Sequence, residues 1–176
     1  MKKQEEVVVV DKHDRIIGTA NRSEVFKKNF IRRISRMILI KDGKIFMQKR
    51  SDTKTLFPGC WDQSAGGHVD KGETYLQCAK RELSEELGVS GVKLHKLGKI
   101  YFEEGTLNEV TLAQFATVYI IKYEDQPIII DTDEISEGKW MSLDEIEVMI
   151  KAEPEKLSIG FLNVWKQFKQ LIVNFS

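Results

Sequence analysis

The sequence predicts an α/β fold in which helices pack on the faces of a mixed β-sheet. Strand-like segments come in runs and do not alternate one by one with helices, which argues against a doubly wound parallel sheet. Two long helical segments each carry an apolar stripe, and such a stripe needs a partner surface to cover it. With 176 residues, of which 41% are hydrophobic, the chain is long enough for one domain with its own core. We therefore expect a single domain over residues 1–176.

Nine segments have the residue pattern of strands. The first two form a hairpin around Lys12–Asp14, and Asp42-Gly43 is the strongest hairpin signal in the chain. We expect residues 1–30 to form a hairpin and a short helix ahead of a core over residues 31–176. In chain order the nine segments are EEVVVVD, RIIGTA, RMILI, KIFMQKR, WDQSAGG, VKLHKLGKIYFEE, EVTLAQFATVYIIKY, PIIID and GKW.

Four segments are expected to be helical. SEVFKKN is short and begins with Ser23 as a cap, whereas residues 73–87 carry Gly88 where a C-terminal cap belongs. SLDEIEVMI starts with a capping box of Ser142 and Glu145. The stripe of the second helix comprises Leu76, Ala79, Leu83 and Leu87, and that of the last helix, which begins near Ser158, comprises Phe161, Trp165, Phe168, Ile172 and Phe175. The last stripe predicts core packing.

The balance of charges gives the chain as a whole no electrostatic attraction for nucleic acid or membranes. It does not exclude a local charged patch. Lys plus Arg and Asp plus Glu both number 27, so the net charge is zero. No apolar run approaches the roughly 20 residues of a membrane span. The start of the chain lacks the apolar core of a signal peptide. Cys60 and Cys78 are the only cysteines, which favours two free thiols and a cytoplasmic location.

Three glutamates, Glu82, Glu85 and Glu86, lie within one turn of the helix predicted over residues 73–87. At 100° per residue they occupy an arc of about 100°, turned away from the apolar stripe. Like charges at these spacings are unfavourable, and acids in the last turn oppose the helix dipole. Either the face is solvated and partly neutralised by Lys80 and Arg81, or the carboxylates share a hard divalent cation.

The residues before this helix favour the cation. Gly66-Gly67 ends a predicted strand and allows backbone conformations closed to other residues. Lys71-Gly72 forms a loop into the helix, and Glu73 is expected in its first turn, where an acid suits the dipole. A flexible loop that leads into a rigid acidic helix is a suitable cradle for a metal–diphosphate.

The stretch from Gly67 to Val89 resembles the complete signature of the Nudix family. Gly67 is followed after five residues by Glu73, and after seven more by Arg81-Glu82-Leu83-Ser84-Glu85-Glu86-Leu87-Gly88-Val89. The resemblance implies an α/β/α sandwich around a mixed sheet and a loop–helix–loop that binds Mg²⁺ or Mn²⁺. It also implies roles for the signature residues: metal ligation by Glu82, Glu85, Glu86 and the carbonyl of Gly67, orientation of a glutamate by Arg81, and support of the loop by Glu73.

Family members hydrolyse a nucleoside diphosphate linked to another group X. A glutamate must accept the proton of the attacking water. Glu86 is our candidate inside the signature, and Glu109 and Glu137 are candidates outside it, where the alternative is an ordinary surface acid. The remaining candidates bind substrate: Lys49, Arg50 and Lys54 for the far phosphate, and Phe57, Trp61 and Tyr101 for stacking, although core or rim packing is the alternative for Trp61.

Longer stretches resemble the branch of the family that contains type 1 isopentenyl-diphosphate isomerase. VVDKHDRIIGTANRSEVF, QKRSDTKTLFPGCWDQSAGGH and the Trp140 region are similar to it. The catalytic cysteine of that branch is replaced by Gly66, and Cys60 does not match it. Of its histidine ligands only His68 has a counterpart, which is either a metal or phosphate contact or an ordinary loop histidine. Glu109 matches one of the later acids, and Leu107 stands where a second belongs.

These departures predict a hydrolase on an isomerase-like frame. We expect a divalent-metal-dependent enzyme that cleaves a diphosphate linkage with an activated water, and a small nucleoside diphosphate derivative as its partner. Two alternatives are isopentenyl-diphosphate isomerisation and a non-catalytic module that senses a nucleotide. The branch is compatible with a homodimer, but no stretch of the sequence demands one.

Overall fold

The computed structural model of the chain describes residues 6–25, 28–107 and 110–175, and for residues 104–107 and 110–111 it describes the backbone alone. Nine strands and four α-helices make up this part of the chain, together with one 3-10 turn, η1. The strands are β1 (Glu6–Val10), β2 (Ile16–Asn21), β3 (Ile31–Lys41), β4 (Lys44–Arg50), β5 (Trp61–Asp62), β6 (Ala65–His68), β7 (His95–Leu107), β8 (Val110–Lys122) and β9 (Ile135–Ser142). The helices are α1 (Arg22–Val25), α2 (Tyr75–Leu87), α3 (Leu143–Ala152) and α4 (Ile159–Phe175), and η1 spans Pro154–Lys156.

The long strand β3 organises the sheet. It pairs in parallel with β8 and antiparallel with β1, β4 and β6, so the sheet is mixed, as predicted. Asp42 and Gly43 connect β3 to β4 with positive φ angles of 50° and 71°, as expected for a two-residue hairpin turn. Because β6 pairs with β3, the Gly66-Gly67 pair lies against the middle of the sheet, opposite Arg36 and Ser35.

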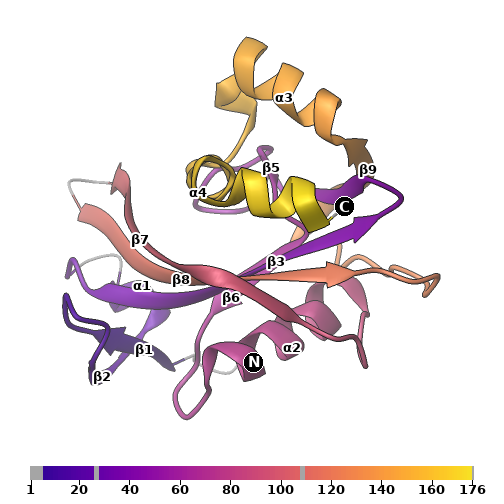
Figure 1. The fold of residues 1–176 in the computed structure, drawn as a ribbon. Helices are drawn as coiled ribbons and strands as arrows, with labels where there is room; N and C mark the ends of the chain where they lie inside the picture. The colour runs from indigo at the N-terminus through magenta and orange to yellow at the C-terminus, as the bar shows by residue number, and fades with distance from the viewer. Residues whose placement is uncertain (1–5, 26–27, 108–109, 176) are drawn as a thin grey trace.

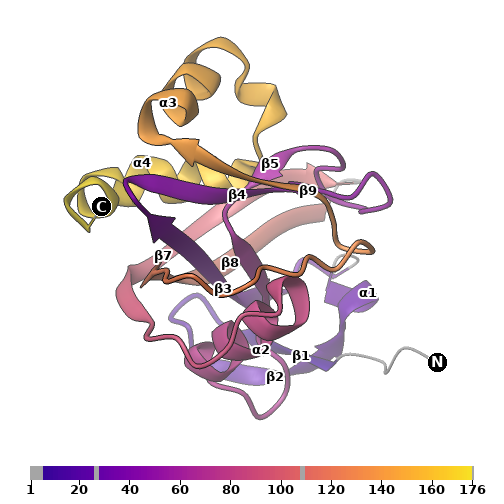
Figure 2. The same cartoon turned by 90° about the vertical axis from the view of Figure 1, so that its right-hand side faces the viewer.

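Helices α2 and α4 cover opposite faces of this sheet, which gives three layers (Figure 1). Alternate residues of β3 serve the two faces. Ile38 and Ile40 are buried in the cluster with α4, whereas Met37 and Leu39 are buried in the cluster with α2. Figure 2 shows α3 at the opposite end of the molecule from the amino-terminal hairpin. The predicted α/β/α sandwich is therefore confirmed.

Four local expectations need correction. Helix α2 begins one residue after its cap Thr74, so Glu73 lies in the preceding loop and not in the first turn. Leu76 is 41% exposed, and Cys78 occupies the buried position instead. Ser23 lies inside α1 and does not precede it. PIIID, residues 127–131, is not a strand, because its backbone N–H groups bind the carbonyls at the end of α2.

The amino-terminal hairpin is attached to the core through Asp14. Its carboxylate accepts hydrogen bonds from Arg33 Nε at 2.7 Å and from Tyr75 Oη at 3.1 Å, and it also pairs with Lys99. These partners come from β3, α2 and β7, so one carboxylate ties the β1–β2 turn to three elements. The hairpin in turn leads into α1, which carries Arg22. None of the helices in the described ranges has the length and apolar character needed to cross a bilayer.

Candidate active site

Helix α2 is held at both ends by its own sequence. Thr74 Oγ1 accepts the backbone N–H of Gln77 at 3.2 Å, and Gln77 Oε1 accepts the N–H of Thr74 at 2.8 Å. This capping box satisfies two of the backbone donors that a helix start leaves open. At the other end Gly88 adopts φ 66°, the left-handed conformation that glycine accepts without a steric cost. The caps fix the position at which the acidic turn stands against the sheet.

Glu86 is the most buried acid of the signature, with an exposed fraction of 7%. Its Oε2 accepts hydrogen bonds from the backbone N–H of Gly66 at 3.2 Å and from Gln48 Nε2 at 3.3 Å. The carboxylate therefore lies between the helix and strands β4 and β6, and it does not belong to a solvated face. The sequence did not single out Gln48, because it stands between the apolar residues Ile45–Met47 and the cations Lys49 and Arg50, and its burial is seen only in the structure.

Glu82 lies directly against the backbone of Gly67. A Cβ atom at Gly67 would be 1.9 Å from Glu82 Oε1, so a larger residue here would have to displace the Glu82 carboxylate, which Arg81 also binds. Glycine therefore lets the Glu82 side chain lie close to the backbone of β6. The assignment of the Gly67 carbonyl and Glu82 as metal ligands stays a prediction.

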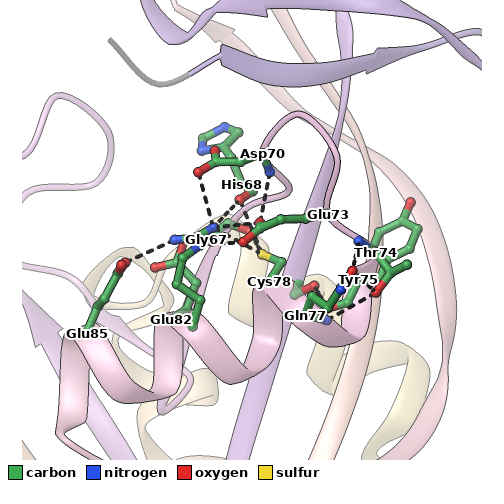
Figure 3. Close-up of polar contacts among 12 residues, drawn as sticks. Gly67, His68, Asp70, Glu73, Thr74, Tyr75, Gln77, Cys78, Glu82 and Glu85 are labelled. Carbon is green, nitrogen blue, oxygen red and sulfur yellow. Dashed lines mark hydrogen bonds and ion pairs between the residues drawn. The ribbon is translucent and has the colours of Figure 1, made fainter. Parts of the chain in front are cut away.

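Arg81 binds three acids through its guanidinium group, and Figure 3 shows these acids, Glu73, Glu82 and Glu85, directed toward one place. Its Nε and Nη2 donate to the two oxygens of Glu73 at 2.7 and 3.0 Å, so this pair is bidentate. Its Nη1 donates to Glu82 Oε1 at 2.7 Å and to Glu85 Oε2 at 3.0 Å, and Nη2 also donates to the carbonyl of His68 at 3.0 Å. Because one planar group binds the loop and two acids of the helix, it sets where the carboxylates stand.

Burial of the acids makes their negative charge costly. Desolvation raises the pKa of Glu82 from 4.5 to about 7, although the nearby Arg81 acts in the opposite direction. Desolvation raises the pKa of Glu86 well above its usual value, and the neighbouring charge of Glu82 adds to this effect. Ionising two neighbouring buried carboxyl groups is costly. A divalent cation bound between them would compensate their negative charge and lower this cost.

The donor set fits a hard divalent cation, but its members are not yet gathered around one point. Among the described residues, no three His, Cys, Asp or Glu side chains are arranged to hold a metal ion. Glu85 is turned onto Arg81, and its side chain is 58% exposed. A rotation of this exposed side chain would be needed for it to join Glu82 and Glu86. Oxygen ligands, the raised pKa values and the close approach at Gly67 all suit Mg²⁺ or Mn²⁺.

A cleft of about 420 Å³, which we call the main cleft, opens in front of these acids. Predicted Arg50 and Lys54 line it, and Lys54 is paired with Glu134 across it. Lys49 does not line the main cleft; it follows Gln48 on β4, where successive side chains point to opposite faces. The full set of lining residues is Arg22, Arg50, Lys54, Gly66, Gly67, His68, Asp70, Arg81, Glu82, Glu85, Glu86, Asp131 and Glu134.

Arg22, Asp131 and Glu134 were not anticipated from the sequence. Arg22 precedes the first residue of the core, and its place in the cleft follows from the attachment of the hairpin. Asp131 ends the segment 127–131, whose backbone is bound to the end of α2, and Glu134 lies three residues further on. No pattern in the sequence indicated that these two segments meet at the acidic helix, because both approach it through long-range contacts.

Two smaller cavities adjoin the main cleft. The side cavity, about 330 Å³, lies between the loop after β4 and the segment before β9, and it is lined by Arg22, Arg50, Thr53, Lys54, Thr55, Leu56, Asp133 and Glu134. The arginine cavity, about 70 Å³, lies behind Gly66 and Gly67, and it is lined by Arg22, Arg32, Ile34, Arg36, Arg50, Leu56, Phe57, Asp62, Gln63, Gly66, Gly67, His68 and Ser158. Of the predicted stacking residues, only Phe57 lines one of these cavities.

The other predicted site residues lie apart from these cavities. Trp61 packs against the core beneath α4, and Tyr101 is 44% exposed and stacks at a tilt on Phe115. Glu137 is exposed on β9, opposite Lys49 of β4. Glu109 lies outside the described residues.

His68 and the two cysteines differ in their relation to the site. His68 lines the main cleft, and burial together with the nearby arginines holds its pKa well below the usual value, so the ring is neutral. Both cysteines are free thiols and both are among the described residues, and neither lines any of the three cavities. Burial raises the pKa of Cys78 to about 12, which makes it a poor acid–base group.

Comparison with known proteins agrees with this architecture. The NUDIX domain family matches residues 31–159. Isopentenyl-diphosphate Delta-isomerase 2 of Photorhabdus laumondii is 30% identical over 159 residues, which are 90% of this chain and 89% of that protein. PA4841 of Pseudomonas aeruginosa, an uncharacterized Nudix hydrolase, is 35% identical over 75% of each chain. The crystal structure of DR0079 from Deinococcus radiodurans superimposes with a TM-score of 0.70 at 29% identity, over 85% of this chain and 90% of that one.

The family match covers more than half of the chain, and it includes the whole acidic helix and the glycine pair. It agrees with the three-layered arrangement of the sheet and its helices. The chain is therefore a member of the Nudix hydrolase family.

Proposed function

We propose that the protein is a divalent-metal-dependent hydrolase that cleaves the diphosphate linkage of a nucleoside diphosphate joined to another group X. The observation that carries the proposal is the opposition of charge within the main cleft. Glu82 and Glu86 on α2 face Arg50 and Lys54 across a space large enough for a diphosphate. A bound diphosphate needs cationic side chains that contact its oxygens. It also needs acids that hold a metal ion beside those oxygens.

The acidic residues of the main cleft would bind the metal ion. Glu82, Glu86 and the Gly67 carbonyl would hold the ion, with Glu85 joining after it leaves Arg81. A bound Mg²⁺ or Mn²⁺ supplies neutralisation of the phosphate oxygens and a lower pKa for the attacking water.

Glu86 is the candidate proton acceptor inside the signature. The hydrogen bonds from Gly66 and Gln48 fix its orientation.

The cationic residues of the main cleft would bind the substrate. Arg50 and Lys54 would contact the phosphate oxygens, and Arg22 adds a third cation to the same cleft. Lys54 forms an ion pair with Glu134, another residue of the main cleft. Arg81 is a positioning residue in this scheme, since its hydrogen bonds go to Glu73, Glu82 and Glu85.

Isopentenyl-diphosphate isomerisation is the second candidate, because a relative with that name is 30% identical over 90% of this chain. Isomerisation needs a group that adds and removes a proton at carbon. The resemblance to that branch implies that Gly66 replaces its cysteine, and the thiols of Cys60 and Cys78 contact the carbonyls of Glu155 and of Gly67 and His68. These positions favour hydrolysis.

The test is a hydrolysis screen over nucleoside diphosphates, nucleotide sugars, dinucleotides and isoprenoid diphosphates with Mg²⁺ or Mn²⁺. Products are identified by ³¹P NMR. We expect cleavage of a phosphoanhydride bond that stops when EDTA is added. Glu86→Gln should lower turnover by at least about 100-fold, since a ligand or base is lost. Glu155→Gln, the same change at an exposed residue of η1, is the matched control and should leave turnover unchanged.

Two results would contradict the proposal. Double-bond migration in an isoprenoid diphosphate without phosphate release would identify an isomerase. Tight nucleotide binding with no turnover in either metal would identify a sensing module.

A further inference from the structure

The arginine cavity has a charge pattern that hydrolysis of a diphosphate does not require. Among the described residues that line it, four are arginines and one, Asp62, is an acid. Asp62 is shared, with one oxygen 3.6 Å from Arg36 Nη1 and the other 3.6 Å from Arg50 Nη1. The wall behind the glycine pair is therefore strongly cationic, in contrast to the acidic wall formed by α2.

The origin of this pattern lies in strand β3. Its residues 32, 34, 36, 38 and 40 point to the face that α4 covers, and Ile38 and Ile40 are buried in the core there. Arg32 and Arg36 occupy the same face further back, and they are 1% and 6% exposed. Two arginines thus occupy positions of β3 at which the alternation of the strand calls for apolar residues. One of them, Arg36, lies against Gly160 at the start of α4.

Neighbouring elements are shaped to keep these guanidinium groups in place. Arg36 donates to Gln63 Oε1 at 2.9 Å and lies over the ring of Phe102. A Cβ atom at Gly160 would be 2.2 Å from Arg36 Nη2, so the first turn of α4 makes room for the group. Arg32 Nη1 lies 3.4 Å from the carbonyl of Ala113, to which it donates. These contacts hold two guanidinium groups at the wall of one cavity, where a ligand of opposite charge would meet several donors at once.

We propose that the arginine cavity is a subsite for a second anionic group, a phosphate or carboxylate carried by X and separate from the scissile diphosphate. The inference rests on the proposed function. Guanidinium forks match both oxyanions, and several cations around a space with low-dielectric walls attract an anion strongly.

Size and position narrow the class of substrate. The volume of about 70 Å³ is far below the roughly 300 Å³ at which pockets for whole ligands begin, so one terminal group fits and a nucleobase does not. Arg22, Arg50, Gly66, Gly67 and His68 line both this cavity and the main cleft, so one molecule can occupy both. An apolar isoprenoid end would have to displace water from guanidinium groups, which is unfavourable.

Matched substrate pairs test the proposal. UDP-glucuronate and UDP-glucose differ by one carboxylate, and NADPH and NADH differ by one phosphate. With Mg²⁺ we expect kcat/KM to be at least about tenfold higher for the charged member of one pair, as a charge-assisted hydrogen bond predicts. Arg32→Gln should reduce that ratio to near one, whereas Glu155→Gln should preserve it.

Because Arg32 is buried, Arg32→Gln could fail to fold, and a second pair of variants covers that outcome. Leu56 is a half-buried loop residue of the same cavity. Leu56→Glu and Leu56→Gln have the same shape and differ only in charge. Leu56→Glu should lower the charged-to-uncharged ratio by about tenfold relative to Leu56→Gln.

Direct binding separates this inference from the proposed function. Inorganic phosphate should bind the metal-free protein in a calorimetric titration. Binding should survive Lys54→Gln, which alters only the main cleft and side cavity, and it should weaken at least about tenfold in Leu56→Glu. Equal kcat/KM within both pairs would overturn the anionic subsite and leave the hydrolase intact. If no diphosphate is cleaved, the proposed function fails, and the absence of this phosphate binding would then overturn the subsite as well.

Discussion

Helices α2 and α4 pack on opposite faces of the same sheet, but they bury different kinds of side chain. The buried set of α4 is apolar apart from a glycine: Gly160, Phe161, Val164, Trp165, Phe168 and Ile172. The buried set of α2 includes a carboxylate: Cys78, Ala79, Leu83, Glu86 and Leu87. One helix is therefore shaped by packing alone, while the other carries a buried charge that packing would not select.

The difference separates the residues that stabilise the protein from those that equip it for chemistry. A buried apolar side chain stabilises the fold in proportion to the area removed from water. A buried carboxylate costs free energy unless a partner or cation compensates it. Substitutions in α4 should therefore change stability, and substitutions on the cleft side of α2 should change activity.

The largest expected effect is on the stability of α4. Phe161 is fully buried, and Phe161→Ala should lower the free energy of unfolding by about 3–5 kcal/mol. Chemical denaturation followed by fluorescence measures this change. Activity per folded molecule should stay near that of the wild type. A large loss of kcat in the folded variant would show that α4 takes part in the reaction.

Glu86→Gln should have the opposite profile. Its turnover falls by at least about 100-fold, but the metal-free protein should not melt at a lower temperature, because a neutral amide does not carry the cost of ionising a buried carboxyl group. Differential scanning calorimetry in EDTA provides the comparison. A marked drop in melting temperature would mean that Glu86 is a structural residue like Phe161.

The metal-free protein should lose stability as the pH rises from about 5 to about 7. The pKa of Glu82 is raised from 4.5 to about 7 in the folded state, so between these values the folded chain holds a proton that the unfolded chain releases. The stabilising effect of the protonated carboxyl is complete below pH 4.5 and is lost as the pH rises through the folded pKa. Thermal unfolding in EDTA should show this slope, and Glu82→Gln should reduce it, with a remainder due to Glu86, whose pKa is also raised in the folded state. A melting temperature that rises over this range in the wild type would refute the assignment.

The smallest effect is expected at the start of α2. Thr74→Ala removes the hydrogen bond from the Gln77 N–H to the Thr74 hydroxyl, one of the two bonds of the capping box. The loss should cost about 1 kcal/mol of stability. Turnover should change little, since the helix end at Gly88 and the acidic turn keep their contacts. Ser142→Ala is the matched change at the capping box of α3. A loss of activity in the Thr74 variant alone would indicate that this cap also positions the acids.

Local patterns were enough to predict most of the fold. The apolar stripe of α4, the capping box at Ser142 and Glu145 and the Asp42-Gly43 turn all appear as expected, because each depends on neighbours in sequence. Residues 127–131 have the composition of a strand, but the open carbonyls of Glu86 and Leu87 bind them instead. Such a tertiary partner cannot be read from a propensity.

The candidate site, like the fold, could be predicted from the sequence only in part. The signature gave Glu82, Glu85 and Glu86 directly, and their shared region follows from helix geometry. Arg22 and Arg32 could not be assigned to the cavities from the sequence, because their places there depend on the pairing of β1 with β3 and on the attachment at Asp14. Glu137 remains a candidate on sequence grounds alone, and it stands on an exposed edge away from the cavities.

Arg22 lines all three cavities, yet it lies outside the stretch that matches the family. A classification based on residues 31–159 would include the acidic helix and overlook this cation. Descendants of a common ancestor could thus keep the same catalytic apparatus while the amino-terminal hairpin diverges and redirects selectivity. Attempts to transfer activity between such proteins should exchange the hairpin together with the loop that follows β4.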